Sequence, residues 1–170
     1  MKIKTDSREN AVCSFTLAVA GSGAVEGACI KYAMLDGASR LAYMAADGFF
    51  ALKECIELYS ALNYIGSDLQ RMEEESGFRG TLSKRHPVRT MHDAKPRLTD
   101  DEFHAARRDH LVASLRLVDE GAACRIECVY QDQRRRQEVL PAYIAMHLCT
   151  AMQRGVEMCR LLGAKPAGSA

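Results

Sequence analysis

The sequence contains no tryptophan, only four prolines in 170 residues, and almost no net charge. Because 23 Lys and Arg balance 22 Asp and Glu to give +1, the composition points to no charged partner. No stretch approaches the roughly 18 apolar residues that cross a bilayer. The first residues, Met-Lys-Ile-Lys-Thr-Asp, lack the apolar core of a signal peptide. We therefore expect a soluble globular protein without membrane association.

Seven cysteines are an odd number, and without an export signal they argue against a disulfide framework. Several lie inside apolar patterns, where a free cysteine packs like a small hydrophobic side chain. The hydrophobic content of 48% excludes disorder over most of the chain. The cysteines therefore predict reduced core thiols and a cytoplasmic protein, or one in another reducing compartment inside the cell.

The first part of the chain carries three alternating runs followed by a helical pattern. Apolar residues alternate with small or polar ones at 13–19 and 29–34, which predicts two half-buried strands joined by a Gly-Ser-Gly turn. Asp36 and Gly37 predict a tight turn into a third strand at 40–44. An amphipathic helix follows. Its apolar stripe contains Phe49, Leu52, Cys55, Ile56, Tyr59 and Leu62.

The same order recurs after residue 110. Alternation predicts three further strands, at 111–117, 124–130 and 134–140. Pro141 suits the first position of a helix, which we expect to end at Gly163 because Pro166 follows. Gly155 lies on the apolar side of this helix, where glycine is unfavourable, and this predicts a close approach to a neighbouring element.

The two parts match in the order of their predicted strands and helix and partly in residue identity, at a spacing of about 95 to 100 residues. Ser14 to Leu17 parallel Ser114 to Leu117. We infer an internal duplication and an α+β fold of tandem β-β-β-α repeats with pseudo-twofold symmetry, in which antiparallel sheets carry one long helix per half on one face. Neither half alone buries enough apolar surface, so we expect one shared core. Its predicted residues are Phe15, Leu17, Ile30, Leu52, Ile56, Leu115, Ile126, Leu148, Met152 and Val156.

The duplication divides the chain into four segments. The first half spans residues 1–76, a connector spans 77–110, the second half spans 111–163, and a flexible tail spans 164–170. The connector contains glycine and proline, few apolar residues, and six Lys or Arg between residues 79 and 97. It closes with a short helix, which Thr99 caps and acidic residues begin.

Sequence motifs for catalysis, cofactors and metals are absent. The sequence has no Gly-Lys-[Ser/Thr] phosphate loop, no Gly-x-Ser-x-Gly, no His-Glu-x-x-His and no Cys-x-x-Cys. Cys124 and Cys128 would share a strand face but lie about 13 Å apart, too far to bind one ion. We expect no catalytic residue, no metal and no cofactor, and hence a protein that is not an enzyme.

The sheet face opposite the predicted core is the most informative surface. It contains Ser14, Thr16, Lys31, Arg116, Arg125 and Glu127, and Arg134 and Arg136 share a strand face that can join it. With the basic connector, this face makes one positive region that suits a phosphate backbone. The residues expected to bind a nucleic acid, single-stranded or structured, are Lys84, Arg85, Arg89, Arg97, Arg116, Arg125, Arg134 and Arg136.

The shortage of aromatic residues keeps an alternative open. Single-strand binders usually offer aromatic platforms for the bases, but here only Tyr43 and Phe78 are expected to be exposed. The alternative is a protein-interaction module, such as an inhibitor, an immunity-type partner or an assembly subunit. It would use the exposed sheet face or an unpaired edge strand. Self-association as a homo-oligomer is compatible with both interpretations.

A sheet followed by a long helix, repeated with pseudo-twofold symmetry, resembles the Whirly and PUR-type folds that bind single-stranded nucleic acids. Those folds use four strands per unit, whereas this sequence predicts three, with Lys2 to Thr5 as a candidate fourth at the start. The resemblance is one of layout, so no residue role is carried over from it.

Overall fold

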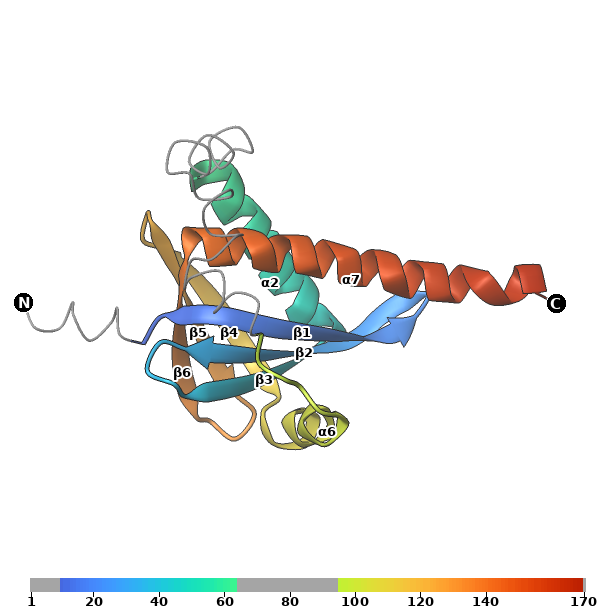
Figure 1. Cartoon of the computed structure of the whole chain (residues 1–170), viewed down its shortest axis with the longest axis horizontal. Helices are drawn as coiled ribbons and strands as arrows, with labels where there is room; N and C mark the ends of the chain where they lie inside the picture. Colours follow the sequence, from blue (N-terminus) through green and yellow to red (C-terminus); the bar gives the residue numbers. More distant parts are fainter. Residues whose placement is uncertain (1–9, 64–94, 170) are drawn as a thin grey trace, which may run out of the picture.

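The computed structural model describes residues 10–63 and 95–169, the last six of these by their backbone alone. Two three-stranded antiparallel sheets, each followed by a helix, confirm the predicted α+β tandem layout (Figure 1). The first unit comprises β1 (Val12–Ser22), β2 (Ala24–Met34), β3 (Ser39–Ala45) and α2 (Ala46–Asn63). The second comprises β4 (Val112–Asp119), β5 (Ala123–Tyr130), β6 (Arg135–Pro141) and α7 (Ala142–Ser169). A short helix, α6 (Asp100–Asp109), precedes β4.

The same backbone geometry recurs in both units. In the turn after the second strand, the Met34 N–H donates to Ala38 O at 2.9 Å, and the Tyr130 N–H donates to Arg134 O at 2.8 Å. Both first strands also carry a bulge at the same place. The bulges lie between Val12 and Ser14 and between Val112 and Ser114. The repeated turns and bulges support the inferred duplication, although the residues of the two units are only partly identical.

The two sheets touch at two corners that are counterparts of each other. At one corner Ala11 pairs with Val139, and at the other Leu111 pairs with Tyr43, both in parallel bridges. Ala11 corresponds to Leu111 in the duplication, and Val139 corresponds to Tyr43. Exchanging the two units therefore turns one corner into the other, as a pseudo-twofold relation requires.

Each helix packs against the first strand of the other unit. α7 lies along β1, and α2 lies against β4 (Figure 1). The hairpin turns also contact the helix of the other unit. The Gly23 N–H of the first hairpin donates to Cys159 O of α7 at 2.7 Å. At the equivalent place, the Tyr59 hydroxyl of α2 donates to Gly121 O at 2.7 Å. The result is one continuous core, which contains all ten predicted residues; Leu17, Leu115 and Val156 lie partly buried at its margin.

The second helix is longer than the sequence predicts. We expected it to end at Gly163, before a tail, but α7 continues past Pro166 to Ser169. Gly163 has a different role, because a Cβ there would lie 2.2 Å from the Cα of Gly23. The glycine lets the β1–β2 turn rest directly on the helix. No helix of the described residues, α7 included, is long and apolar enough to cross a membrane.

Gly155 shows the close approach that its position predicts. A Cβ on this buried residue would lie 2.5 Å from Val19 Cγ2 of β1. Gly155, Cys159 and Gly163 recur every four residues along one face of α7, which is the face that meets the first hairpin. Small side chains there allow the strand and the helix to approach closely.

Candidate nucleic-acid interface

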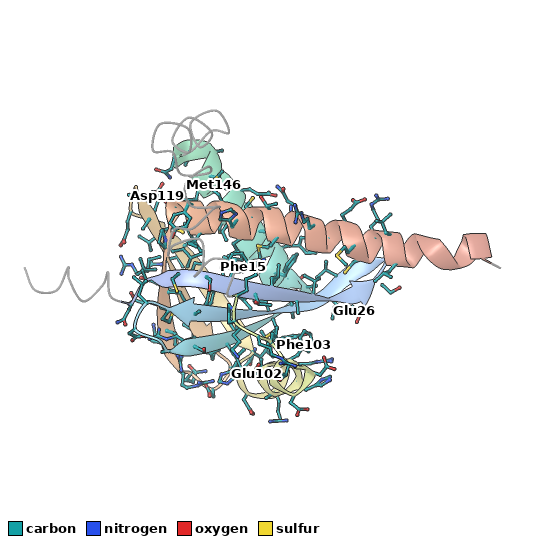
Figure 2. The ribbon with its side chains drawn as sticks, in the orientation of Figure 1. Phe15, Glu26, Glu102, Phe103, Asp119 and Met146 are labelled. Carbon is teal, nitrogen blue, oxygen red and sulfur yellow. The ribbon has the colours of Figure 1, made fainter. Side chains whose placement is uncertain are left out.

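The outer face of the first sheet, which we predicted to be open, is covered by α6 and the residues before it. Thr16 Oγ1 donates to Pro96 O, and Lys31 Nζ donates to Arg97 O and to Glu102 Oε2, the latter two at 2.7 Å. Figure 2 shows Glu102 where α6 meets this sheet. The prediction that the outer face of the first sheet is exposed is therefore wrong.

A second, small core explains why α6 lies there. The ring of Tyr43 covers Gly27, where a Cβ would meet the tyrosine oxygen at 2.1 Å, and it contacts Phe103 of α6 edge-on at 5.5 Å between centroids. Ala106 is fully buried between the helix and the sheet. The predicted Thr99 cap begins α6 as a complete capping box. Tyr43 thus packs against α6 and is buried, whereas we expected it to be exposed.

Arg116 and Arg125 lie on the outer face of the second sheet, and acidic side chains neutralise both. The register places Arg116 opposite Glu127, and its Nη2 lies 2.6 Å from Glu127 Oε1. Arg125 pairs with Glu120 and also lies 3.5 Å from Glu127 Oε2. Because these two arginines share their charge with two carboxylates, this face alone is not strongly positive.

Arg136 does not share that face, contrary to our prediction. The register pairs it with Cys128, whose side chain is buried, so Arg136 points toward the inner side of the sheet. Arg134 lies in the turn before β6, and its guanidinium stacks on the ring of Tyr130 at 4.8 Å. Its Nε lies 2.7 Å from Asp132 Oδ2, so the turn holds this side chain in place.

The remaining residues of the predicted set belong to the connector. Lys84, Arg85 and Arg89 lie outside the described residues, as does Phe78. Arg97 is exposed beside the covered face of the first sheet, where its carbonyl accepts a hydrogen bond from Lys31. It lines neither of the two hollows described next.

Four arginines converge where β3 and β6 begin. They line an open hollow of about 550 Å³, whose described residues are Arg40, Arg134, Arg135, Arg136 and Gln137. A second hollow of about 300 Å³ lies over the second sheet, reaches Arg116, and shares Arg135, Arg136 and Gln137 with the first. The second hollow is also lined by Glu127, the partner of Arg116, and by Ser114, Leu115, Cys128 and Val129. We call the two hollows together the arginine groove, after its cationic residues Arg40, Arg116, Arg134, Arg135 and Arg136.

The sequence analysis missed Arg40 and Arg135. Arg40 is the counterpart of Arg136 in the duplication, because each is the second residue of the third strand of its unit. The duplication was therefore a signal that could have found it. Since two equivalent arginines line one hollow, the groove lies at the boundary between the units.

A buried carboxyl contacts the arginine groove from inside. Glu138 is 2% exposed, and Arg40 Nη1 donates to its Oε1 and to Gln137 O, both at 3.3 Å. Burial raises the pKa of Glu138 to about 7, although Arg40 and Arg136 act in the opposite direction. At neutral pH this carboxyl is only partly ionised, so it offsets only part of the charge of Arg40 and Arg136.

His110 lies close to the arginines of the groove, and their charges affect its pKa. Burial lowers the pKa of its imidazole, and the charges of Arg134 and Arg136 lower it further. Its Nδ1 lies 3.2 Å from Arg134 Nη2, which suits a neutral ring that accepts a hydrogen bond. His110 therefore helps to hold Arg134 without adding a competing charge.

Four of the seven cysteines are buried, and the other three are half-buried. All seven are free thiols, and burial raises the pKa of Cys29, Cys124 and Cys128 to about 12. These three thiols are un-ionised at neutral pH and are poor nucleophiles and metal ligands. Over residues 10–63 and 95–169, no group of three His, Cys, Asp or Glu is placed to hold a metal ion.

The comparisons with known proteins find no matching family model, no matching curated protein and no matching solved structure. The likeness to the Whirly and PUR-type folds thus rests on the order of the elements alone. Any function must be inferred from the geometry of the groove.

Proposed function

We propose that the protein is a non-enzymatic nucleic-acid-binding protein, which holds the phosphate backbone of a single-stranded or structured nucleic acid in the arginine groove. The observation that carries this proposal is the convergence of Arg40, Arg134, Arg135 and Arg136 around one open hollow. A guanidinium presents parallel N–H donors that match phosphate oxygens, and an open groove admits a continuous backbone.

Two of these arginines are held in place and two are unpaired. Arg134 is fixed by its turn, and Arg40 is held by the buried Glu138. Arg135 and Arg136 form no ion pair with any residue that the structure describes. A phosphate would therefore meet pre-positioned donors as well as free charges, which limits the side-chain entropy lost on binding.

The groove suits backbone contacts better than base contacts. Tyr130 is buried beneath Arg134, and the described lining of the two hollows contains no aromatic side chain. Base stacking on aromatic rings supplies much of the affinity of many single-strand binders. We therefore propose binding with little sequence preference and a strong dependence on salt.

Fluorescence anisotropy with a labelled single strand and a labelled RNA hairpin tests this proposal at about 50 mM salt. The variant Arg135→Gln with Arg136→Gln should weaken binding at least about tenfold, because it removes two charged hydrogen-bond donors. The matched control, Arg107→Gln with Arg108→Gln, removes the same charge from exposed residues of α6 and should bind like the wild type. No binding by the wild type, or equal weakening in both variants, contradicts the proposal.

A second candidate, a protein-interaction module, is favoured by the apolar end of α7. Met158, Leu161 and Leu162 are 63%, 54% and 51% exposed, on the part of α7 that lies beside the β1–β2 turn. This is the right-hand part of the helix in Figure 1. Exposed apolar side chains grouped at one place are typical of a surface that docks another protein. Inhibitors, immunity-type partners, assembly subunits and homo-oligomers all fit this description.

Capture of partners from a lysate, with and without nuclease, separates the two candidates. Nucleic acid in the eluate supports the first candidate. One dominant protein that survives nuclease treatment supports the second.

A further inference from the structure

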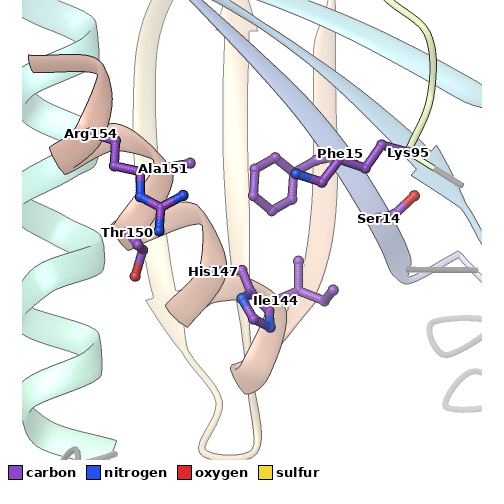
Figure 3. A pocket seen from close by; sticks show the side chains of 8 residues that line it. All are labelled: Ser14, Phe15, Lys95, Ile144, His147, Thr150, Ala151 and Arg154. Carbon is purple, nitrogen blue, oxygen red and sulfur yellow. The ribbon is translucent and has the colours of Figure 1, made fainter. Parts of the chain in front are cut away.

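A pocket unrelated to the arginine groove lies between β1 and α7 (Figure 3). Its volume is about 240 Å³. Residues from three parts of the chain line it: Phe15 of β1, Lys95 from the segment before α6, and a row along α7. In that row, Ile144, His147, Ala151 and Arg154 recur every three or four residues, so they share one helix face.

The pocket has an apolar floor. Phe15 and Ile144 are 7% and 1% exposed, and both belong to the main core or pack within it. Ala151 leaves space above them, because its side chain is a single methyl group. A flat apolar body placed there would be covered on one side by the phenyl ring of Phe15.

The rim of the pocket is cationic. In the view of Figure 3, Arg154 lies on one side of the Phe15 ring and Lys95 on the other, and both line the pocket. Neither forms an ion pair with a residue in the described parts of the chain, and no described carboxylate lines the pocket. Ser14 adds a hydroxyl donor to the wall and is itself only 3% exposed.

We infer that this pocket binds a small organic anion, whose acid group lies between Arg154 and Lys95 and whose apolar body lies on Phe15 and Ile144. Two cations without a described acidic partner are complementary to one carboxylate or phosphate group. The volume is below the usual range of roughly 300–1,000 Å³ for drug-sized ligands. The ligand is therefore a small molecule, with a body about the size of one aromatic ring.

NMR titration of the full chain tests this inference with four probes: benzoate, phenyl phosphate, neutral benzyl alcohol and inorganic phosphate. Benzoate or phenyl phosphate should shift the amide signals of residues 144–154. Each should also bind at least about tenfold more tightly than benzyl alcohol or inorganic phosphate, because only these two probes contact both the apolar floor and the cationic rim. The stronger of the two anionic probes identifies the acid group. Equal binding of benzyl alcohol, shifts confined to residues 134–136, or no shift with any probe would overturn the inference.

Two substitutions separate this pocket from general charge effects. Arg154→Gln should weaken the preferred anion at least about tenfold. Arg160→Gln removes the same charge from α7 beyond the pocket, at a residue paired with Glu157, and should leave binding unchanged. Ala151→Leu should abolish binding by filling the space above Phe15. Equal effects of Arg154→Gln and Arg160→Gln would contradict the assignment even if Ala151→Leu failed to fold.

Discussion

Glu138 lies almost entirely out of water, where the sheets of the two units meet. Arg40 of β3 donates to it, Arg136 lies on its own strand, and Tyr32, Tyr130 and Cys128 face it from β2 and β5. Burial raises the pKa of Tyr130 to about 12, with Cys128 and Glu138 acting in the same direction, so the neighbouring hydroxyl stays protonated. A carboxyl in such surroundings is costly to ionise, even with an arginine beside it.

The raised pKa of Glu138 predicts a pH-dependent stability. Between the unfolded value near 4.5 and about 7, the folded protein binds more protons than the unfolded chain. The contribution of Glu138 is therefore fully present below about pH 4.5 and is lost as the pH rises through 7, by about 1–3 kcal/mol of unfolding free energy.

Glu138→Gln should remove this loss, because the amide keeps an oxygen for Arg40 but does not ionise. Urea denaturation at pH 5 and pH 8 measures the difference. Glu127→Gln is the control, since the hydrogen bond from Arg116 holds the pKa of Glu127 below its usual range. This carboxyl is therefore ionised in both states between pH 5 and pH 8 and adds no pH dependence there. If Glu138→Gln and the wild type lose the same stability between the two pH values, Glu138 is ionised in both states.

At the scale of elements, the two units differ most in the β1–β2 hairpin and its contact with α7. β1 and β2 have 11 residues each, whereas β4 and β5 have eight. The longer hairpin reaches along α7 as far as Gly163. The helix can continue there because the turn packs against it, although the sequence signals an end.

Gly163→Ala should destabilise the protein by about 1–3 kcal/mol, because the new Cβ would collide with the backbone of Gly23. Gly48→Ala in α2 is a matched control, since its Cβ would lie 3.5 Å from Met44 Cβ, an ordinary contact. It should stabilise by up to about 1 kcal/mol through helix propensity. Thermal unfolding measures both, and a stabilising Gly163→Ala would show that the hairpin does not rest on the helix.

At the scale of the whole molecule, the exchange of helices makes the two units one cooperative structure. Leu52 of α2 and Leu148 of α7 are equivalent residues, 1% and 0% exposed, in the same core. Each substitution to alanine should cost about 2–5 kcal/mol and shift one common unfolding transition. Calorimetry tests this expectation, and two separate transitions, each sensitive to only one substitution, would show that the halves fold independently.

Much of this architecture could be predicted from the sequence because alternation and helical spacing are local signals. The face to which Arg136 points could not be predicted in this way, since it depends on strand register. A shift of one residue moves a side chain to the other face of the sheet. The position of α6 was also hidden, because Phe103 and Ala106 give it a short apolar face whose partner lies far away in the chain. Arg40 joined the candidate site only when the two units were placed together.

The dependence of nucleic-acid affinity on salt tests the central claim most directly. For the wild type, the logarithm of the binding constant should fall linearly with the logarithm of salt concentration, because bound phosphates release counterions. In Arg135→Gln with Arg136→Gln the slope should be smaller by about 1 to 2 units, at about 0.7 per lost contact with a single strand. A wild-type affinity that does not change with salt, or an unchanged slope in the variant, would contradict a phosphate backbone held in the arginine groove.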